Sequence, residues 1–243
     1  MDTPPGSLIQ RVVQALSRVI DPELDESITA LRFVREVLAN GHGDVEVRLR
    51  LPTPQCAPNF AFLMGADARR VVAAVPGVRS VTVRLEDHYT GEEINQALSR
   101  GQGFSAAFPG ESADDGLETL RAIFTRKALI GRQSTLCEQL LGEGWSPEEI
   151  VASRLGDLPP GALSRRIREL RGQLGLDSSD AAPGFVQPGG EPVGLPELER
   201  WRRAARLMRL SLEANGGICR DLLAARHGLS RDPHDTPPLE VLT

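Results

Sequence analysis

The sequence is short of cysteine: Cys56, Cys137 and Cys219 are the three among 243 residues. Small secreted domains stabilised by disulfides carry a dense and even set of cysteines, so that class is excluded. The first residues lack a basic segment followed by an apolar run, and no stretch approaches about eighteen uninterrupted apolar residues. We therefore expect no signal peptide and no membrane span, which predicts a cytoplasmic protein with reduced thiols.

Lysine is rarer still, because Lys127 is the one lysine among 28 basic residues. A GC-rich coding sequence explains the use of arginine without a functional cause. The formal net charge is -5, which argues against a general nucleic-acid-binding protein. We expect neither a nucleic acid nor a membrane as a partner.

The motifs of several enzyme classes are also missing. The sequence has no Gly-x-x-x-x-Gly-Lys phosphate loop, no Gly-x-Ser-x-Gly nucleophile elbow, no His-Glu-x-x-His zinc helix and no Cys-x-x-Cys pair. A nucleotide-dependent enzyme is therefore poorly supported, and we expect a protein that is not an enzyme.

The first hundred residues alternate between helical and strand periods. Ser7 and Gln10 have the spacing of a capping box before a helical pattern that ends at Asp21-Pro22. A strand-like run over 31–39 meets an Asn-Gly turn, and the alternating run over 45–51 completes a hairpin. A helical pattern after Pro58 and a third strand over 81–85 follow. The order α-β-β-α-β predicts a small two-layer α/β domain.

No strand pattern follows Leu85, so the fold class is α+β, with an all-α C-terminal region. The glycine pair before Cys219 is expected to break the last, arginine-rich helix. The predicted boundaries are an α/β domain over 1–100, a connector over 101–116, a helical region over 117–177, a linker over 178–196 and a C-terminal helical segment with a tail over 197–243.

Cys56 is the most informative single residue. It lies between the second predicted strand and the second helix, and Pro58 suits the first turn of that helix. Unpaired N–H groups at a helix N-terminus stabilise an anion, so a thiolate there is a ready metal ligand or nucleophile. The alternative is a small buried hydrophobic side chain, which is the usual environment of free cysteine. Placement alone leaves both alternatives open.

Several segments together resemble the SufT/PaaD-like iron–sulfur cluster assembly family. They are Val19-Ile20-Asp21-Pro22-Glu23-Leu24, the strand over 45–51, the Thr53…Cys56 loop and the Val75-Pro76-Gly77-Val78 segment. The resemblance covers roughly residues 8 to 86. It implies a protein that helps to load clusters onto client enzymes, with Cys56 as the ligand and with Asp21, Glu23 and Thr53 shaping its loop. The sequence departs from the family pattern at Ala57, which stands between the cysteine and Pro58.

A single thiolate cannot hold an iron–sulfur cluster, which takes about four protein ligands. His88, just after the third strand, and Cys219 are candidate further metal ligands, although His88 also fits a surface turn. His227 is a weak partner for Cys219, because eight helical residues span about 12 Å. Cys137 has the apolar neighbours of a core residue. A homodimer that shares one site, or a client's own thiols, would supply the remaining ligands.

The leading hypothesis is an assembly or maturation factor that uses Cys56 to hold a transient iron–sulfur cluster or iron. Its partners would be a client metalloprotein or the assembly machinery. Two alternatives remain: a non-catalytic adaptor for a multicomponent oxygenase or another enzyme, and a thiol-dependent enzyme with Cys56 as nucleophile and His88 as base.

Overall fold

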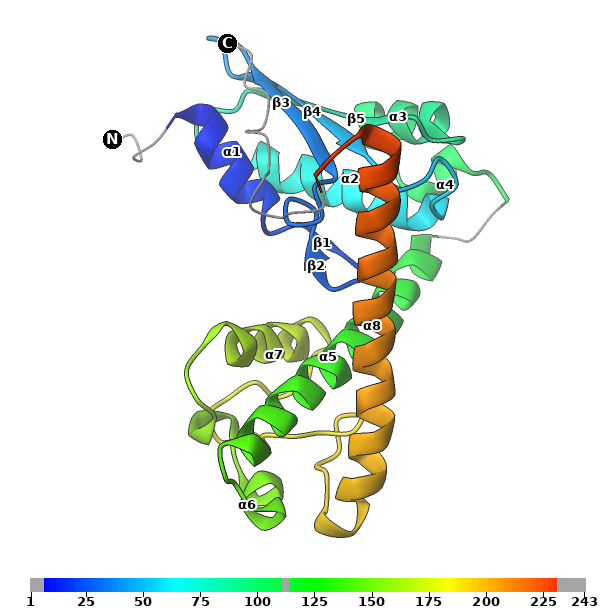
Figure 1. Ribbon diagram of the computed structural model, residues 1–243. Coiled ribbons are helices and arrows are strands. Elements are labelled where there is room, and N and C mark those ends of the chain that lie inside the picture. The colour runs from blue at the N-terminus through cyan, green and yellow to red at the C-terminus, as the bar shows by residue number, and fades with distance from the viewer. Residues whose placement is uncertain (1–6, 111–113, 231–243) are drawn as a thin grey trace. The chain divides into compact units, whose positions relative to one another are not determined.

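The computed structural model describes residues 7–110 and 114–230. Two compact units divide the chain. The N-terminal unit consists of Met1–Glu118 with Gly216–Thr243, and the helical unit consists of Thr119–Asn215. Helices and strands occur together in the first unit, as Figure 1 shows, so the predicted α+β class is confirmed. No helix within the described ranges is both long enough and apolar enough to cross a membrane.

The N-terminal unit contains two sheets. Strands β3 (Val34–Ala39), β4 (Asp44–Arg50) and β5 (Ser80–Glu86) form a sheet in the order β3-β4-β5. Strand β3 is antiparallel to β4, and β5 is parallel to β4. The predicted hairpin and the crossover through a helix are therefore confirmed. The short pair β1 (Ile20–Asp21) and β2 (Glu26–Ser27) was not predicted from the sequence.

Local side-chain contacts fix the hairpin and the first helix. The Asn40 Oδ1 atom accepts hydrogen bonds from the backbone N–H groups of His42 and Asp44, each at 3.0 Å, so the chain reverses at this point. Ser7 and Gln10 form the predicted capping box at the start of α1 (Leu8–Leu16). Strand β3 begins three residues later than predicted, because Arg32 has a φ of +63° and turns the chain just before it.

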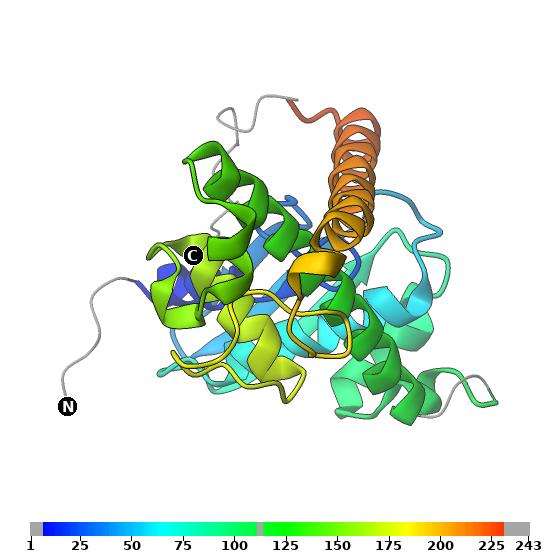
Figure 2. The ribbon, with the colours of Figure 1, turned by 90° about the horizontal axis from the view of Figure 1, so that it is seen from below.

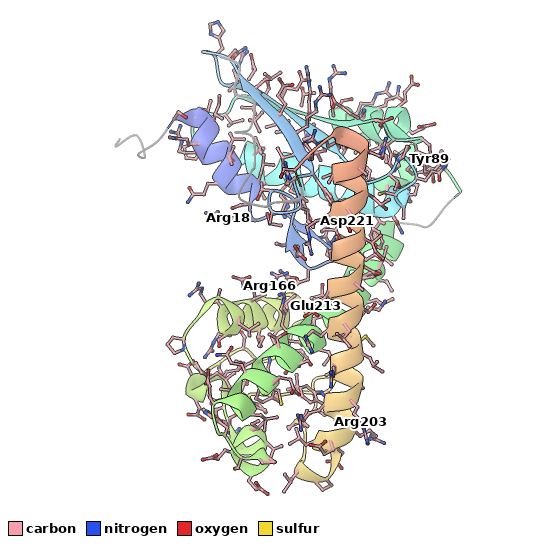
Figure 3. All side chains as sticks on the ribbon, in the orientation of Figure 1. Arg18, Tyr89, Arg166, Arg203, Glu213 and Asp221 are labelled. Atoms are coloured by element: carbon pink, nitrogen blue, oxygen red, sulfur yellow. The ribbon has the colours of Figure 1, made fainter. Side chains whose placement is uncertain are left out.

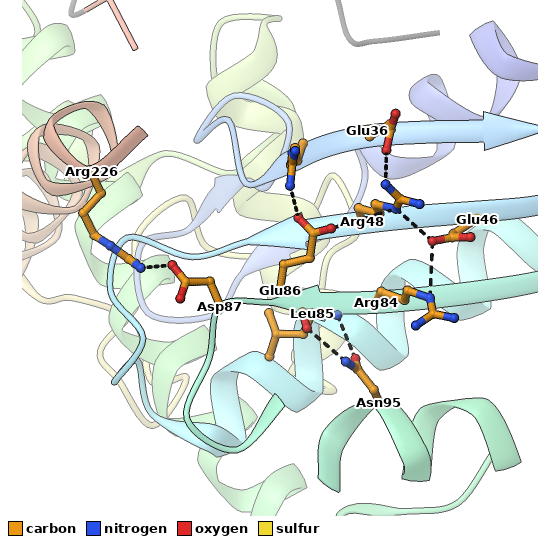
Figure 4. A network of polar contacts seen from close by, with 10 residues as sticks. Glu36, Glu46, Arg48, Arg84, Leu85, Glu86, Asp87, Asn95 and Arg226 are labelled. Atoms are coloured by element: carbon orange, nitrogen blue, oxygen red, sulfur yellow. Dashed lines mark hydrogen bonds and ion pairs between the residues drawn. The ribbon is translucent and has the colours of Figure 1, made fainter. Parts of the chain in front are cut away.

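Two helices bury the apolar side of the three-stranded sheet. Helix α1 packs on β3, α2 (Pro58–Ala73) packs on β5, and the two helices contact each other. Helices α3 (Gly91–Arg100) and α4 (Phe104–Ala107) follow, and α3 packs on β5 and α2. The other side of the sheet is charged: Arg48 pairs with Glu36 at 2.7 Å and with Glu46 at 2.9 Å (Figure 4). The alternation of apolar and charged residues along β4 therefore separates a core face from a polar face.

The helical unit has its own core. It contains most of α5 (Asp114–Gly142), α6 (Pro147–Ala152), the 3-10 turn η1 (Leu155–Asp157), α7 (Ala162–Gln173), the 3-10 turn η2 (Leu195–Glu197) and the first part of α8 (Leu198–His227). Ser146 forms a capping box with Glu149 at the start of α6. Leu129, Cys137, Leu140, Ile150 and Ile167 are fully buried in this core.

Residues 178–196, predicted as a linker from their composition, form an irregular coil that contributes to this core. Figure 2 shows this coil, in yellow, leading from α7 to the start of α8. Phe185 and Val186 within it are buried. The buried Arg171 donates to Gly184 O at 2.9 Å, and the Gln133 Oε1 atom accepts from Val186 N at 2.8 Å. The side chains of Arg171 and Gln133 thus form hydrogen bonds with backbone groups of the coil, which has no regular helix or sheet to pair them.

The glycine pair at Gly216 and Gly217 does not break α8, so that prediction was wrong. The helix runs without interruption from Leu198 to His227. A glycine costs about 1 kcal/mol relative to alanine inside a helix, which packing contacts can offset. A Cβ atom on Gly216 would lie 3.0 Å from the Glu26 Oε1 atom, so the missing side chain leaves room for that carboxylate.

The conformation of Gly43 provides a test of the hairpin. Its φ is +83°, and a Cβ atom there would lie 2.4 Å from Gly77 O. We expect Gly43→Ala to lower the free energy of unfolding by about 2 kcal/mol or more, because the left-handed conformation alone costs an alanine about 1–2 kcal/mol. Chemical denaturation of the two proteins measures the difference.

Gly41→Ala is the matched control, because nothing lies within 4 Å of a Cβ atom at that position. Equal losses of stability in the two variants would contradict this description of the turn.

Candidate functional site

Cys56 lies in the loop between β4 and α2, where the sequence predicts it. Helix α2 begins at Pro58, two residues after Cys56, and its N-cap residue Ala57 provides no side-chain hydrogen bond. The Cys56 thiol is half-buried and lies 3.6 Å from the Thr53 hydroxyl. Cys56 N donates to Thr53 O at 3.4 Å, and Gln55 N donates to Thr53 Oγ1 at 3.3 Å. Thr53 therefore folds the loop back on itself and brings its hydroxyl to the sulfur.

The β5–α3 loop holds the Cys56 loop from a second side. His88 Nε2–H donates to Cys56 O at 2.7 Å, and His88 Nδ1 accepts from Thr90 N at 3.2 Å. These partners assign the tautomer of His88 with its proton on Nε2. Tyr89 N also donates to Pro54 O at 2.9 Å. Both ring nitrogens of His88 are thus engaged, and the ring contacts the backbone of Cys56 rather than its thiol.

Asp21 is a buried carboxyl group at the start of the β1–β2 turn. Its side chain is 6% exposed and accepts hydrogen bonds from Glu23 N at 2.8 Å and Leu24 N at 2.9 Å. Burial raises the pKa of Asp21 to about 6, although the two backbone donors act in the opposite direction. Asp21 therefore fixes the turn that also carries Glu23.

Cys219 brings a second thiol to this region from α8. It is half-buried and packs against the same core as Cys56. Burial raises the pKa of Cys219 to about 11, and the neighbouring Asp21, Cys56 and Glu23 raise it further in that order. Asp21, Glu23 and Cys56 therefore act on Cys219 electrostatically, although no three of these side chains form a metal-binding group among the described residues. The fold thus packs Cys219 against the same core as Cys56, which lies far from it in the sequence.

Two arginines that the sequence does not single out attach this part of α8 to the N-terminal unit. Arg220 pairs with Glu26 of β2 at 2.7 Å. Arg226 donates to Leu51 O and Pro52 O, each at 3.3 Å, and forms an ion pair with Asp87 (Figure 4). Arg226 thus contacts the segment just before Thr53 and the residue just before His88. No motif marks these arginines, because their partners, two carboxylates and two backbone oxygens, come from distant segments.

The third cysteine lies in the core, as the sequence predicts, and His227 is not a partner of Cys219. Cys137 is fully buried in the core of the helical unit, and burial raises its pKa to about 11. Because α8 is continuous, His227 lies eight helical residues, or about 12 Å along the axis, beyond Cys219. Burial and then Arg50 and Arg226 lower the pKa of His227, and its Nε2 atom has no hydrogen-bond partner among the described residues. The structure therefore does not pair His227 with Cys219.

The part of the chain that the structure describes has too few neighbouring metal ligands for a closed site. Across residues 7–110 and 114–230, no three His, Cys, Asp or Glu side chains form a group that could hold a metal ion. A cluster needs about four ligands. Any cluster at Cys56 and Cys219 would therefore need ligands from outside the described residues.

Comparison with known proteins identifies the N-terminal third. A family model described as iron–sulfur cluster assembly protein matches residues 9–84. An uncharacterized protein of Methanocaldococcus jannaschii is 32% identical over 87 residues, which cover 36% of this chain and 90% of that protein. The chain therefore belongs to the iron–sulfur cluster assembly protein family through this segment.

Two named relatives share the same segment. A chloroplastic Fe-S cluster assembly factor of Arabidopsis thaliana is 39% identical over 75 residues, or 30% of this chain and 14% of that protein. An iron–sulfur cluster carrier protein of Synechocystis is 38% identical over 74 residues, or 30% of this chain and 20% of that protein. The chain thus spans only a small part of each. No solved structure matches it.

Two of the candidate site residues are not covered by the family segment. His88 and Cys219 lie outside the matched residues 9–84.

The raised pKa of Asp21 predicts a pH dependence of stability. Because the folded-state pKa of about 6 lies above the ordinary 3.8, the folded state holds this proton more tightly than the unfolded state. Its contribution to stability is full below about pH 4 and is lost as the pH rises through 6, by about 3 kcal/mol in all. We expect Asp21→Asn, which keeps an acceptor for Glu23 N and Leu24 N, to lack this loss.

Urea denaturation of both proteins between pH 4 and pH 7.5 tests this expectation. The difference in stability between Asp21→Asn and the native chain should grow with pH in favour of the variant. A difference that is constant across the range would contradict the burial of an ionisable Asp21.

A second prediction concerns the attachment of α8. We expect Arg226→Gln to raise the rate at which iodoacetamide alkylates Cys219 by about tenfold, because part-buried hydrogen bonds of a charged group to Leu51 O and Pro52 O are lost. Peptide mass spectrometry measures the rate at each cysteine. Arg203→Gln, on the same helix and exposed, is the control and should leave the rate unchanged. Equal rates in both variants would show that Arg226 does not hold α8 in place.

Proposed function

We propose that this protein is an iron–sulfur cluster assembly or maturation factor that holds iron or a cluster transiently through Cys56 and Cys219. It would pass this cargo to a client metalloprotein. The observation that carries the proposal is that two half-buried thiols, Cys56 in the family segment and Cys219 on α8, pack against the same core. Family membership supports the assembly role, and the names of the two relatives are consistent with a protein that is not an enzyme.

An incomplete ligand set suits a protein that must release its cargo. Two thiolates leave about half of the ligand positions of a cluster open. A second copy of the chain in a homodimer, or the client's own cysteines, would fill them. The client's thiolates would then replace those of this chain one at a time. The exchange is easier because this chain does not enclose the metal with a full set of ligands.

The electrostatics of the site favour loading with a cation. Burial and the nearby Asp21 and Glu23 raise the pKa of Cys219, so its thiol is protonated at neutral pH. A bound iron ion would displace that proton, because the thiolate is the ligand. The acidic neighbours that disfavour a bare thiolate would also attract the positively charged iron.

The alternative of a thiol-dependent enzyme receives less support. A nucleophilic cysteine needs a base within hydrogen-bond reach of its sulfur. His88 contacts Cys56 O with one ring nitrogen and Thr90 with the other, while the described contact of the Cys56 sulfur is with the Thr53 hydroxyl. His88 is better explained as a positioning residue for the Cys56 loop. The adaptor alternative differs from both, because it predicts that Cys56 and Cys219 have no role in function.

Anaerobic reconstitution with ferrous iron and sulfide tests the proposal. We expect the native chain to develop the visible absorption of an iron–sulfur cluster, Cys56→Ala to lose it and Cys219→Ala to retain less than about half, because each variant removes a ligand from an already short set. Cys137→Ala is the matched control, since that cysteine is buried in the helical unit, and it should load like the native chain.

Client activity in cells separates the alternatives. If Cys56→Ala neither loads iron nor supports a client metalloenzyme, the assembly role holds. Full client activity together with failure of every protein to load iron would instead favour the adaptor. Selective alkylation of Cys56 at neutral pH in the absence of metal would favour the thiol-dependent enzyme.

A further inference from the structure

The helical unit contains a groove that the assembly chemistry does not use. It lies between α5, the coil at Gln187 and Pro188, and the first turns of α8, and it holds a volume of about 320 Å³. Ile130, Trp201, Ala204 and Met208 supply apolar lining. Met208 is 41% exposed there. This volume is at the lower end of ligand-binding pockets and has room for one or two apolar side chains of a ligand.

Three cations surround the apolar lining. Arg126, Lys127 and Arg200 line the groove and are exposed, and no carboxylate is among the lining residues. None of the three forms an ion pair with a described residue; the Lys127 ammonium instead lies 4.4 Å from the centre of the Phe124 ring. Unpaired cations around an apolar depression favour an anionic partner with an apolar anchor.

The positive charge of α8 is reduced beside the groove. Arg202 pairs with Glu138 at 2.9 Å and with Glu199 at 2.7 Å, and Arg209 pairs with Glu213 at 2.9 Å. A nucleic-acid surface needs a continuous basic track for successive phosphates. Three cations around a hollow of side-chain size match a short acidic peptide better.

A buried donor in the groove wall also lacks a partner. Trp201 is 5% exposed, and its indole Nε1–H has no hydrogen-bond partner among the described residues. Buried indole N–H groups ordinarily find an acceptor. Because this N–H is closed off from the groove, an acceptor of a bound peptide would reach it only after the indole shifts.

From these observations we propose that the groove docks an acidic segment of a partner protein, with an apolar side chain seated over Trp201 and acidic side chains beside Arg126, Lys127 and Arg200. The site is separate from Cys56, and docking at the groove does not depend on metal binding. It gives the helical unit a role in choosing the partner.

Fluorescence titration of the full chain tests the docking site. The chain has two tryptophans, so Trp145→Phe leaves Trp201 as the only reporter. The probe is an acetylated and amidated synthetic peptide of sequence Asp-Glu-Leu-Phe-Asp-Glu. We expect a saturable change in Trp201 emission, and about tenfold weaker binding after Lys127→Glu with Arg200→Glu, because each reversal replaces an attraction by a repulsion.

Arg203→Glu is the matched control. Arg203 is exposed on the same helix and does not line the groove, and Figure 3 shows its side chain extending outward from α8. It should change the affinity by no more than about twofold. Ala204→Glu, which places a carboxylate in the groove, should abolish binding. Cys56→Ala should bind the peptide like its parent, which separates this test from the iron-loading test.

Three results would overturn the docking site. One is the absence of saturable binding up to about millimolar peptide. Another is equal binding of a peptide in which serine replaces the leucine and phenylalanine, since the apolar anchor would then be irrelevant. The third is tighter binding of a single-stranded oligonucleotide that the same charge reversals abolish, since the cations would then serve a nucleic acid.

Discussion

Arg226 connects the segments on which the candidate site depends. From the last turn of α8 it binds the backbone oxygens of Leu51 and Pro52 and pairs with Asp87. The first two residues precede the Cys56 loop, and Asp87 precedes His88, which holds Cys56 O. Because the same helical segment carries Cys219, one guanidinium group orders both loops and the second thiol. Without this attachment the family segment would keep Cys56 but would lack its neighbouring sulfur.

Several turns and helix starts of the N-terminal unit could be predicted, because short-range side-chain interactions determine them. The capping box at Ser7, the Asn40 turn and the helix start at Pro58 each depend on residues a few positions apart, so their sequence patterns are sufficient. The site residues Asp21 and Cys56 were identified by position in a family pattern. The contacts of His88 with Cys56 O, and of Cys219 with this region, depend on tertiary packing, which a single sequence does not encode in any spacing.

Two expectations about glycine-rich segments also failed to take tertiary packing into account. Gly216 and Gly217 lie inside a continuous helix, and Glu26 occupies the space that a side chain at Gly216 would fill. The Pro- and Gly-rich residues 178–196 have the composition of a linker, yet Arg171 and Gln133 satisfy their backbone groups, and Phe185 is buried beside Trp201. Composition predicts how a segment behaves alone, whereas partners elsewhere in the chain decide whether it is packed. In the two proposals, the units have different roles: the thiols of one hold the metal, and the cationic groove of the other binds a partner.

The central claim is that Cys56 and Cys219 face one site. Treatment of the apo protein with a short bifunctional thiol reagent, followed by peptide mass spectrometry, tests it most directly. The account predicts a cross-link between the peptides of Cys56 and Cys219, none to Cys137, and protection from the reagent after anaerobic loading with iron. Modification of the two cysteines only separately, with no cross-linked product at any reagent concentration, would contradict the shared site.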